Sequence, residues 1–234
     1  MNTQSDNNPA IRLGFYASLS LAIITLITFG FAMTALPNSG SFCIVDCVEY
    51  PYLDTLSEYP GDYLWMPLAM LLLVAYLVHT GSLHSLASER YKIFSRIGLA
   101  FAIMAALVLM LCYFIQFSVV PVSLMKGETE GIALLTQYNP HGVFIAMEEL
   151  GYWMMTFSFL FMAFVFSNKS RIENAIRWIY IIGFVVTVIA FAMISFKYGL
   201  DRQYRFEIVI ISIDWLVLII NGILTGLVFR RAWK

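Results

Sequence analysis

Six long apolar runs recur along this chain and limit what it can fold into. A helix rises about 1.5 Å per residue, so about 20 apolar residues cross the roughly 30 Å hydrocarbon core of a bilayer. None of the runs has the alternating pattern of a barrel strand, and lipid offers no partner to unpaired backbone groups. We therefore expect an all-α polytopic membrane protein: one domain over 1–234, a bundle of six transmembrane helices. The expected spans are 13–36, 63–82, 97–121, 143–167, 175–196 and 207–229.

The composition agrees with a protein whose main partner is the lipid bilayer. The chain is 60% hydrophobic and 12% charged, whereas soluble domains carry about 25% charged residues. The net charge of -1 leaves no basic face for nucleic acid. The first run is too long for the core of a signal peptide, and only Arg12 precedes it. We expect it to be retained, with cleavage after small residues in "FAMTALPNSG" as the alternative.

Lysine and arginine predict the orientation, because these residues gather in the cytoplasmic loops of membrane proteins. With both termini cytoplasmic, ten of them face inward and four face outward. Three of the four outward residues lie in the loop between the fifth and sixth runs, which is an exception to the rule. The inward residues are Arg12, Arg90, Lys92, Arg96, Lys169, Arg171, Arg177, Arg230, Arg231 and Lys234, and the outward ones are Lys126, Lys197, Arg202 and Arg205.

The outward loop 37–62 is acidic and holds Cys43 and Cys47, which can close a disulfide on the oxidising side of the membrane. Free thiols are the main alternative. Redox catalysis would need a second reactive pair, and only Cys112, within the third run, remains. Short elements are expected elsewhere: a surface helix in "ETEGIALLTQY", and a fifth helix capped by Ser170 or Asn168.

No motif of known mechanism is present: the chain has no phosphate-binding glycine loop, HExxH, GxSxG or metal-spaced His/Cys set. We therefore expect no catalytic residue, no metal and no cofactor. His79 and His84 lie at the inner end of the second run, and His141 lies on the other side of the membrane. The tryptophans fit interfacial belts or packing better than a ligand cage.

The sixth run carries Glu207, Asp214 and Asn221, which are spaced by sevens and so lie on one stripe of a helix. Asp214 is about 5 Å from the middle of the run, where a charge costs about 2.5–3.5 kcal/mol. This stripe cannot face lipid. Two interpretations stay open for Asp214: an interhelical hydrogen bond, often worth only about 0.6 kcal/mol, or a functional site. Asn221 fits the hydrogen bond better.

The fourth run begins "NPHGVFIAMEELGYW", and we expect its helix to start at Pro140 with Asn139 as the N-cap. Glu148 and Glu149 then point about 100° apart, so only one faces the bundle squarely. We expect this to be Glu148, with a solvated interfacial pair as the alternative. Its face of the helix also carries His141, Ile145, Tyr152 and Met155.

The four acids fall in the outer half of the bundle, together with Gln116 and Tyr113 of the third run; they are Glu148, Glu149, Glu207 and Asp214. We expect an outward-facing polar pocket in which Lys197, Arg202 and Arg205 pair with the acids and keep them ionised. The expected binding residues are Asp214, Glu148, Glu149, Gln116, Asn221, Glu207 and His141.

Two segments, "GETEGIALLTQYNPHGVFIAMEELGYWMMTFSFLFMAFVF" and "YGLDRQYRFEIVIISIDW", resemble a group of uncharacterised prokaryotic six-helix integral membrane proteins. The resemblance implies the architecture and a bacterial or archaeal plasma membrane, but no activity. The pocket favours binding or translocation of a small polar or cationic solute. A structural or accessory subunit, as a homo-oligomer or with a protein partner, is the alternative. A membrane-embedded enzyme comes last, because no nucleophile or metal is available.

Overall fold

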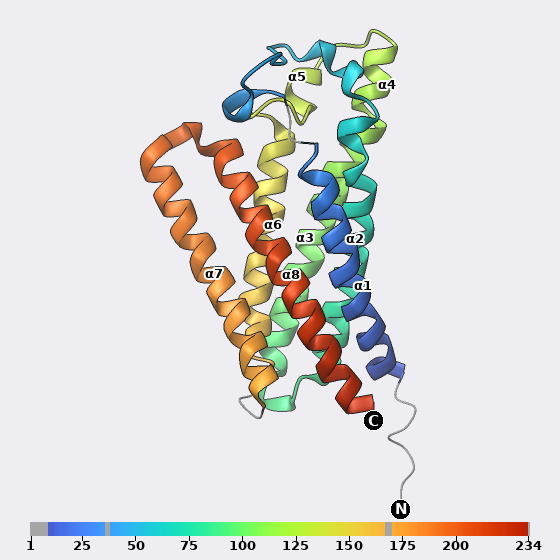
Figure 1. The fold of residues 1–234 in the computed structure, drawn as a ribbon, viewed down its shortest axis with the longest axis vertical. Helices are drawn as coiled ribbons and strands as arrows, with labels where there is room; N and C mark the ends of the chain where they lie inside the picture. The colour runs from blue at the N-terminus through green and yellow to red at the C-terminus, as the bar shows by residue number, and fades with distance from the viewer. Residues whose placement is uncertain (1–8, 36–37, 167–169, 234) are drawn as a thin grey trace, which may run out of the picture.

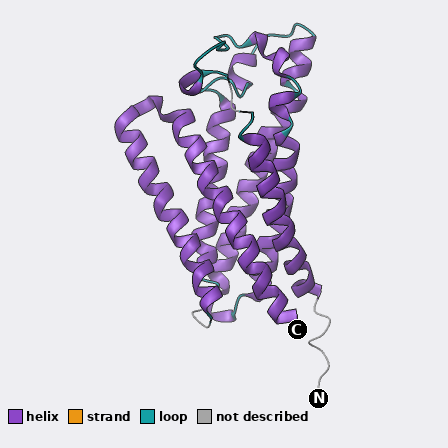
Figure 2. Ribbon diagram, in the orientation of Figure 1, coloured by secondary structure: helices purple, strands orange, loops and turns teal. Residues whose placement is uncertain are grey.

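The computed structural model describes residues 9–35, 38–166 and 170–233 (Figure 1). This part of the chain consists of helices, turns and loops without a strand (Figure 2), so the all-α prediction is confirmed for it. Several residues on which predictions rested lie outside the described residues: Leu36 and Ser167 at the ends of predicted runs, the alternative cap Asn168, and Lys169 and Lys234.

Each predicted apolar run falls on one long helix. These helices are α1 (Pro9–Ala32), α2 (Trp65–Leu86), α3 (Lys92–Ser118), α6 (Val143–Ala163), α7 (Arg171–Tyr198) and α8 (Gln203–Trp233). By length and hydropathy alone, four described segments can cross a membrane: Pro9–Ala32, Gly61–Leu86, Glu89–Met125 and Arg171–Trp233. The last of them contains two helices, because α7 and α8 run antiparallel and meet at the short helix η5 (Gly199–Arg202) (Figure 1).

The long helices pack around a core in which α6 contacts α3, α7 and α8, while α1 lies between α2 and α8. Helix α7 stands at the edge of the bundle (Figure 1). Large apolar side chains cover the outer surface, such as Leu107 and Leu111 on α3 and Ile189 and Met193 on α7. Polar side chains are buried inside, and this arrangement suits a bundle surrounded by lipid.

Small residues bring α1 and α8 into close contact. A Cβ atom on Gly222 would lie 2.9 Å from the carbonyl oxygen of Ser18, and one on Gly14 would lie 2.2 Å from the ring of Phe229. Such residues let helix backbones approach closely in membranes. The first and last helices of the chain are therefore direct neighbours.

Loops and short helices form a cap over one end of the bundle, opposite the start of α1 and the end of α8 (Figure 1). The cap is joined to α8, because Ser39 Oγ donates to the carbonyl of Tyr138 (2.6 Å) and lies 3.0 Å from the hydroxyl of Tyr204. Tyr204 also donates to the carbonyl of Gln137, and Tyr138 donates to Asp62 (2.8 Å). Burial, and then this bond to Asp62, raise the pKa of Tyr138. The short helices of the cap are η1 (Gly40–Phe42), η2 (Leu53–Glu58), η3 (Gly61–Tyr63), α4 (Val120–Met125) and α5 (Ile132–Leu135), and η4 (Glu89–Tyr91) lies at the other end.

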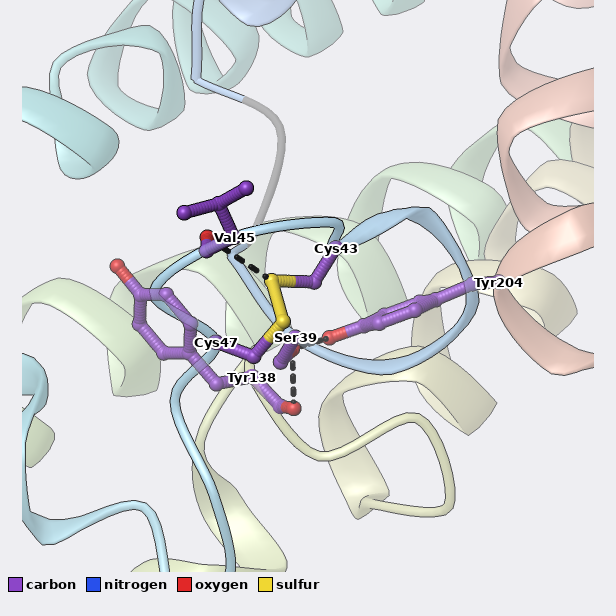
Figure 3. Close-up of a disulfide and its surroundings, with 6 residues drawn as sticks. All are labelled: Ser39, Cys43, Val45, Cys47, Tyr138 and Tyr204. Carbon is purple, nitrogen blue, oxygen red and sulfur yellow. Dashed lines mark hydrogen bonds between the residues drawn. A yellow bond between two sulfur atoms is a disulfide. The ribbon is translucent and has the colours of Figure 1, made fainter.

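Cys43 and Cys47 form a disulfide within this cap (Figure 3). The remaining cysteine, Cys112, is a buried thiol whose Sγ donates to the carbonyl of Phe144. Near the disulfide, Figure 3 shows the ring of Tyr204 reaching Ser39. The disulfide therefore closes a small ring close to the point where the cap meets α8.

The predicted start of α6 is wrong by three residues. The helix begins at Val143 after Gly142, because the side chain of Asn139 accepts a hydrogen bond from the backbone N–H of His141 and forms a local turn instead of a helix cap. An N–H used in this way supports a turn rather than a helix. At α7 the side chain of Ser170 does cap the helix, accepting from the N–H of Glu173.

Candidate functional site

A cleft lies beneath the cap, between the ends of α1, α2, α6 and α8 that the cap covers. Its volume is about 70 Å³. This is room for about five waters, or for a ligand of similar size, at roughly 10–15 Å³ each. Four aromatic side chains and two carboxyl groups are among its lining residues: Phe29, Trp65, Phe144, Trp215, Glu148 and Glu207.

The two carboxyl groups are buried side by side. Glu148 is 1% exposed and Glu207 is 7% exposed, and their side chains interact directly. Glu148 Oε1 has no hydrogen-bond partner among the described residues. Two buried carboxylates repel each other, so the pair is stabilised by a proton or a cation between them.

The basic residues expected to neutralise these acids do not reach the cleft, so that prediction is wrong for Glu148, Glu207 and Asp214. Arg202 pairs instead with Glu149 (2.6 Å) and lies over the ring of Phe191. The other two remain at the loop between α7 and α8: Arg205 contacts Asp201 and the ring of Tyr198, and Lys197 lies over the same ring. They sit at the end of the α7–α8 hairpin, away from the cleft. None of the described residues that line the cleft is a lysine or an arginine.

Hydrogen bonds fix the aromatic side chains at the base of the cleft. The hydroxyls of Tyr113 and Tyr152 are 2.9 Å apart, and Trp215 Nε1 donates to Tyr152 at 3.0 Å. The ring of Trp65 lies edge-on to that of Tyr113, with the centroids 5.1 Å apart. This leaves Trp65 and Trp215 as rigid walls of the cleft.

The predicted stripe of α8 is buried along its length but reaches the cleft only at Glu207. Asp214 is 0% exposed and accepts hydrogen bonds from Thr156 Oγ1 at both carboxyl oxygens (3.0 and 3.1 Å). Asn221 is 1% exposed and lies beside Tyr180. The stripe faces the interior of the bundle.

The other predicted binding residues are dispersed. Gln116 is buried and accepts a hydrogen bond from the backbone N–H of Gln137, a lining residue, so it supports the wall of the cleft. Glu149 is occupied by Arg202 outside the cleft. His141 is exposed in the turn before α6 and takes no part in the site, since the helix that would have carried it inward starts after it.

Several residues of the site were not predicted. The aromatic side chains that line the cleft come from four helices, α1, α2, α6 and α8, and gave no signal beyond their apolar character. A second polar contact lies in the half of the bundle farther from the cap, where Ser18 Oγ is 3.1 Å from His79 Nδ1 and Thr225 Oγ1 donates to Ser18 at 3.3 Å. Small polar residues within apolar runs were the only indication of it.

Comparisons with protein families, with curated proteins and with solved structures find no match to this chain. The chemistry of the cleft itself is informative. Paired carboxyl groups attract a cation by charge, and the faces of aromatic rings attract it through their quadrupoles, most strongly for tryptophan. The arrangement is suited to holding one small positive ion.

Proposed function

We propose that this chain is a six-span membrane protein that binds a small organic cation in the cleft at Glu148 and Glu207 and carries it across the membrane. In this proposal α1, α2, α3, α6, α7 and α8 each cross the bilayer of a prokaryotic plasma membrane. Both termini are cytoplasmic, and the cleft faces outward.

Two features support six crossings. Helix α6 has 21 residues, which at about 1.5 Å per residue is long enough to cross about 30 Å of hydrocarbon. Helix α6 has a lower mean hydropathy than the four segments named above, because it contains Glu148 and Glu149. Glu148 is buried, and Glu149 is paired with Arg202. The antiparallel pair α7 and α8 then returns the chain to the side from which α7 began.

One observation supports an ammonium ion as the ligand. Among the described residues, one carboxyl oxygen of Glu148 has no hydrogen-bond partner, and it lies beside Glu207 in a cleft lined by aromatic side chains. A buried acceptor without a donor costs about 1–3 kcal/mol, more when charged, and the N–H group of an ammonium ion would satisfy it. The ring faces would contact carbon atoms attached to the nitrogen. The volume limits the ligand to about five non-hydrogen atoms, and ethylammonium meets this limit while keeping N–H groups that can donate to Glu148.

The proposal is tested by titrating the purified protein in lipid nanodiscs with ethylammonium, reading tryptophan fluorescence because Trp65 and Trp215 line the cleft. We expect saturable binding that Glu148→Gln weakens at least tenfold. Glu89→Gln, which changes an exposed carboxylate at η4, is the matched control and should bind as the wild type does.

Absence of binding in the wild type, or equal binding in Glu148→Gln, would overturn the proposal. Native mass spectrometry of the gently extracted protein separates the alternatives. A retained lipid would assign the ammonium group to a lipid headgroup, and a retained protein would favour an accessory subunit.

A further inference from the structure

Helix α8 carries a row of buried polar side chains through most of the bundle. Glu207, Asp214, Asn221 and Thr225 are 7%, 0%, 1% and 0% exposed. At about 1.5 Å per residue, the row extends about 27 Å, close to the roughly 30 Å thickness of the hydrocarbon core. Packing alone needs no such row, because apolar side chains would fill the same space without the cost of burying polar groups.

In the outer half, hydroxyl groups connect the carboxyl pair to the level of Asp214. Glu148 lies beside Tyr113, whose hydroxyl is 2.9 Å from that of Tyr152. Asp214 lies next along α8 and is held by Thr156. The titratable groups that face Asp214 are Tyr152 of α6 and Tyr76 of α2, and neither provides a positive charge.

Below Asp214 the buried polar atoms lack partners. The hydroxyls of Tyr76 and Ser158 and both amide atoms of Asn221 form no hydrogen bond among the described residues. Tyr76 lies beside Ser158, and Asn221 lies beside Tyr180, so these polar groups gather in the core without completing their hydrogen bonds. Buried polar groups in this condition generally hold ordered water, which completes their hydrogen bonds.

At its inner end, the row of polar side chains on α8 is linked to His79 of α2. Thr225 donates to Ser18, and Ser18 contacts His79, which is 2% exposed. His84 follows five residues later on α2, is half-buried, and contacts Ser95 at 2.7 Å. Each imidazole has two ring nitrogens that can accept and donate hydrogen bonds, and chains of Asp, Glu and His inside membranes mark proton relays.

We propose that these groups, the polar column, conduct protons between the outer cleft and the inner end of the bundle. A proton binds a carboxylate oxygen of the Glu148–Glu207 pair, and the hydroxyls of Tyr113 and Tyr152 each accept one proton while releasing another. Asp214 receives it, and ordered water at Asn221 passes it to His79 and then to the inner side. Only O–H and N–H bonds form and break, so the net change is one proton moved.

The polar column begins at the cleft of the proposed function but needs no organic cation. It is tested in proteoliposomes that trap a pH-sensitive dye, with a potassium gradient and valinomycin to drive proton entry. We expect the wild type to acidify the interior faster than protein-free vesicles, Asp214→Asn to slow this at least tenfold, and Glu89→Gln to match the wild type. Equal rates in wild-type and protein-free vesicles, or in wild type and Asp214→Asn, would overturn the proposal.

Tyr152→Phe is a second variant for the case in which Asp214→Asn does not fold. It removes one hydroxyl and keeps the ring. It should also slow proton entry several-fold, and a rate equal to the wild type would overturn the relay. Fluorescence titration of the same vesicles with ethylammonium separates the two proposals. Proton entry without cation binding would overturn the proposed function alone, and cation binding without proton entry would overturn the polar column alone.

Discussion

Helices α7 and α8 are neighbours in sequence and in space, yet they differ in what they bury. Helix α8 places carboxyl, amide and hydroxyl groups against the core, whereas α7 stands at the edge with Val185, Ile189 and Met193 exposed. The residues that α7 buries are Ile176, Tyr180, Gly183 and Thr187.

Hydropathy predicts that both helices can cross a membrane, but it does not show which of them buries the polar groups of the site. Both belong to a single apolar segment, Arg171–Trp233. The distinguishing signal is the kind of polar side chain that is buried: α8 buries two carboxyl groups and an amide at intervals of seven, whereas α7 buries the hydroxyls of Tyr180 and Thr187. A helix that keeps costly groups buried has a role that an edge helix lacks.

The largest effect is expected from placing a charge on the exposed face of α7. Val185→Asp near the middle of this helix should destabilise the inserted protein by about 2.5–3.5 kcal/mol, because the carboxylate would meet lipid. Protein yield in the membrane and the thermal unfolding midpoint measure it, with Val185→Leu as the control. Normal yield and midpoint would show that this face of α7 does not contact lipid.

A smaller effect is expected where α8 meets α1. Gly222→Ala places a Cβ atom 2.9 Å from the carbonyl oxygen of Ser18. Since backbone must move to relieve this contact, the free energy of unfolding should fall by about 1–3 kcal/mol. Gly30→Ala on α1, where nothing lies within 4 Å of the new atom, should leave the unfolding midpoint unchanged. Equal midpoints for the two variants would contradict the close packing of α1 and α8.

The smallest effect is expected at the hairpin that joins the two helices. Arg202→Ala removes the partner of Glu149 and the contact with Phe191, but both charged groups are partly exposed, so the loss should be about 1 kcal/mol. Lys197→Ala, which changes an exposed residue, should not alter the unfolding midpoint. If Lys197→Ala is the more destabilising change, the arrangement of charges at this hairpin is wrong.

Local patterns predicted much of this structure. The apolar runs located the long helices, the spacing of Glu207, Asp214 and Asn221 placed them on one buried face, and the angle between Glu148 and Glu149 separated the inward residue from the outward one. Each of these inferences needs only the geometry of a single helix.

The partners across helices were not predicted, because they depend on which helices touch and at what height. The contact between Glu148 and Glu207 joins α6 to α8, and the contact between Ser18 and His79 joins α1 to α2. Arg202 was expected near the inward acids, but its place at η5 brings it to Glu149 instead. Charge alone could not distinguish these acids.

The contact between the first and last helices also sets an order for assembly during synthesis. A ribosome makes α1 long before α8, yet the surface that covers Ser18 belongs to α8. The cap has the same dependence, since Ser39 binds Tyr204, 165 residues later in the chain. A nascent chain therefore keeps the Ser18 face of α1 uncovered until α8 has been made, and a chain that stops before α8 presents that face to the proteases that remove unfinished membrane proteins.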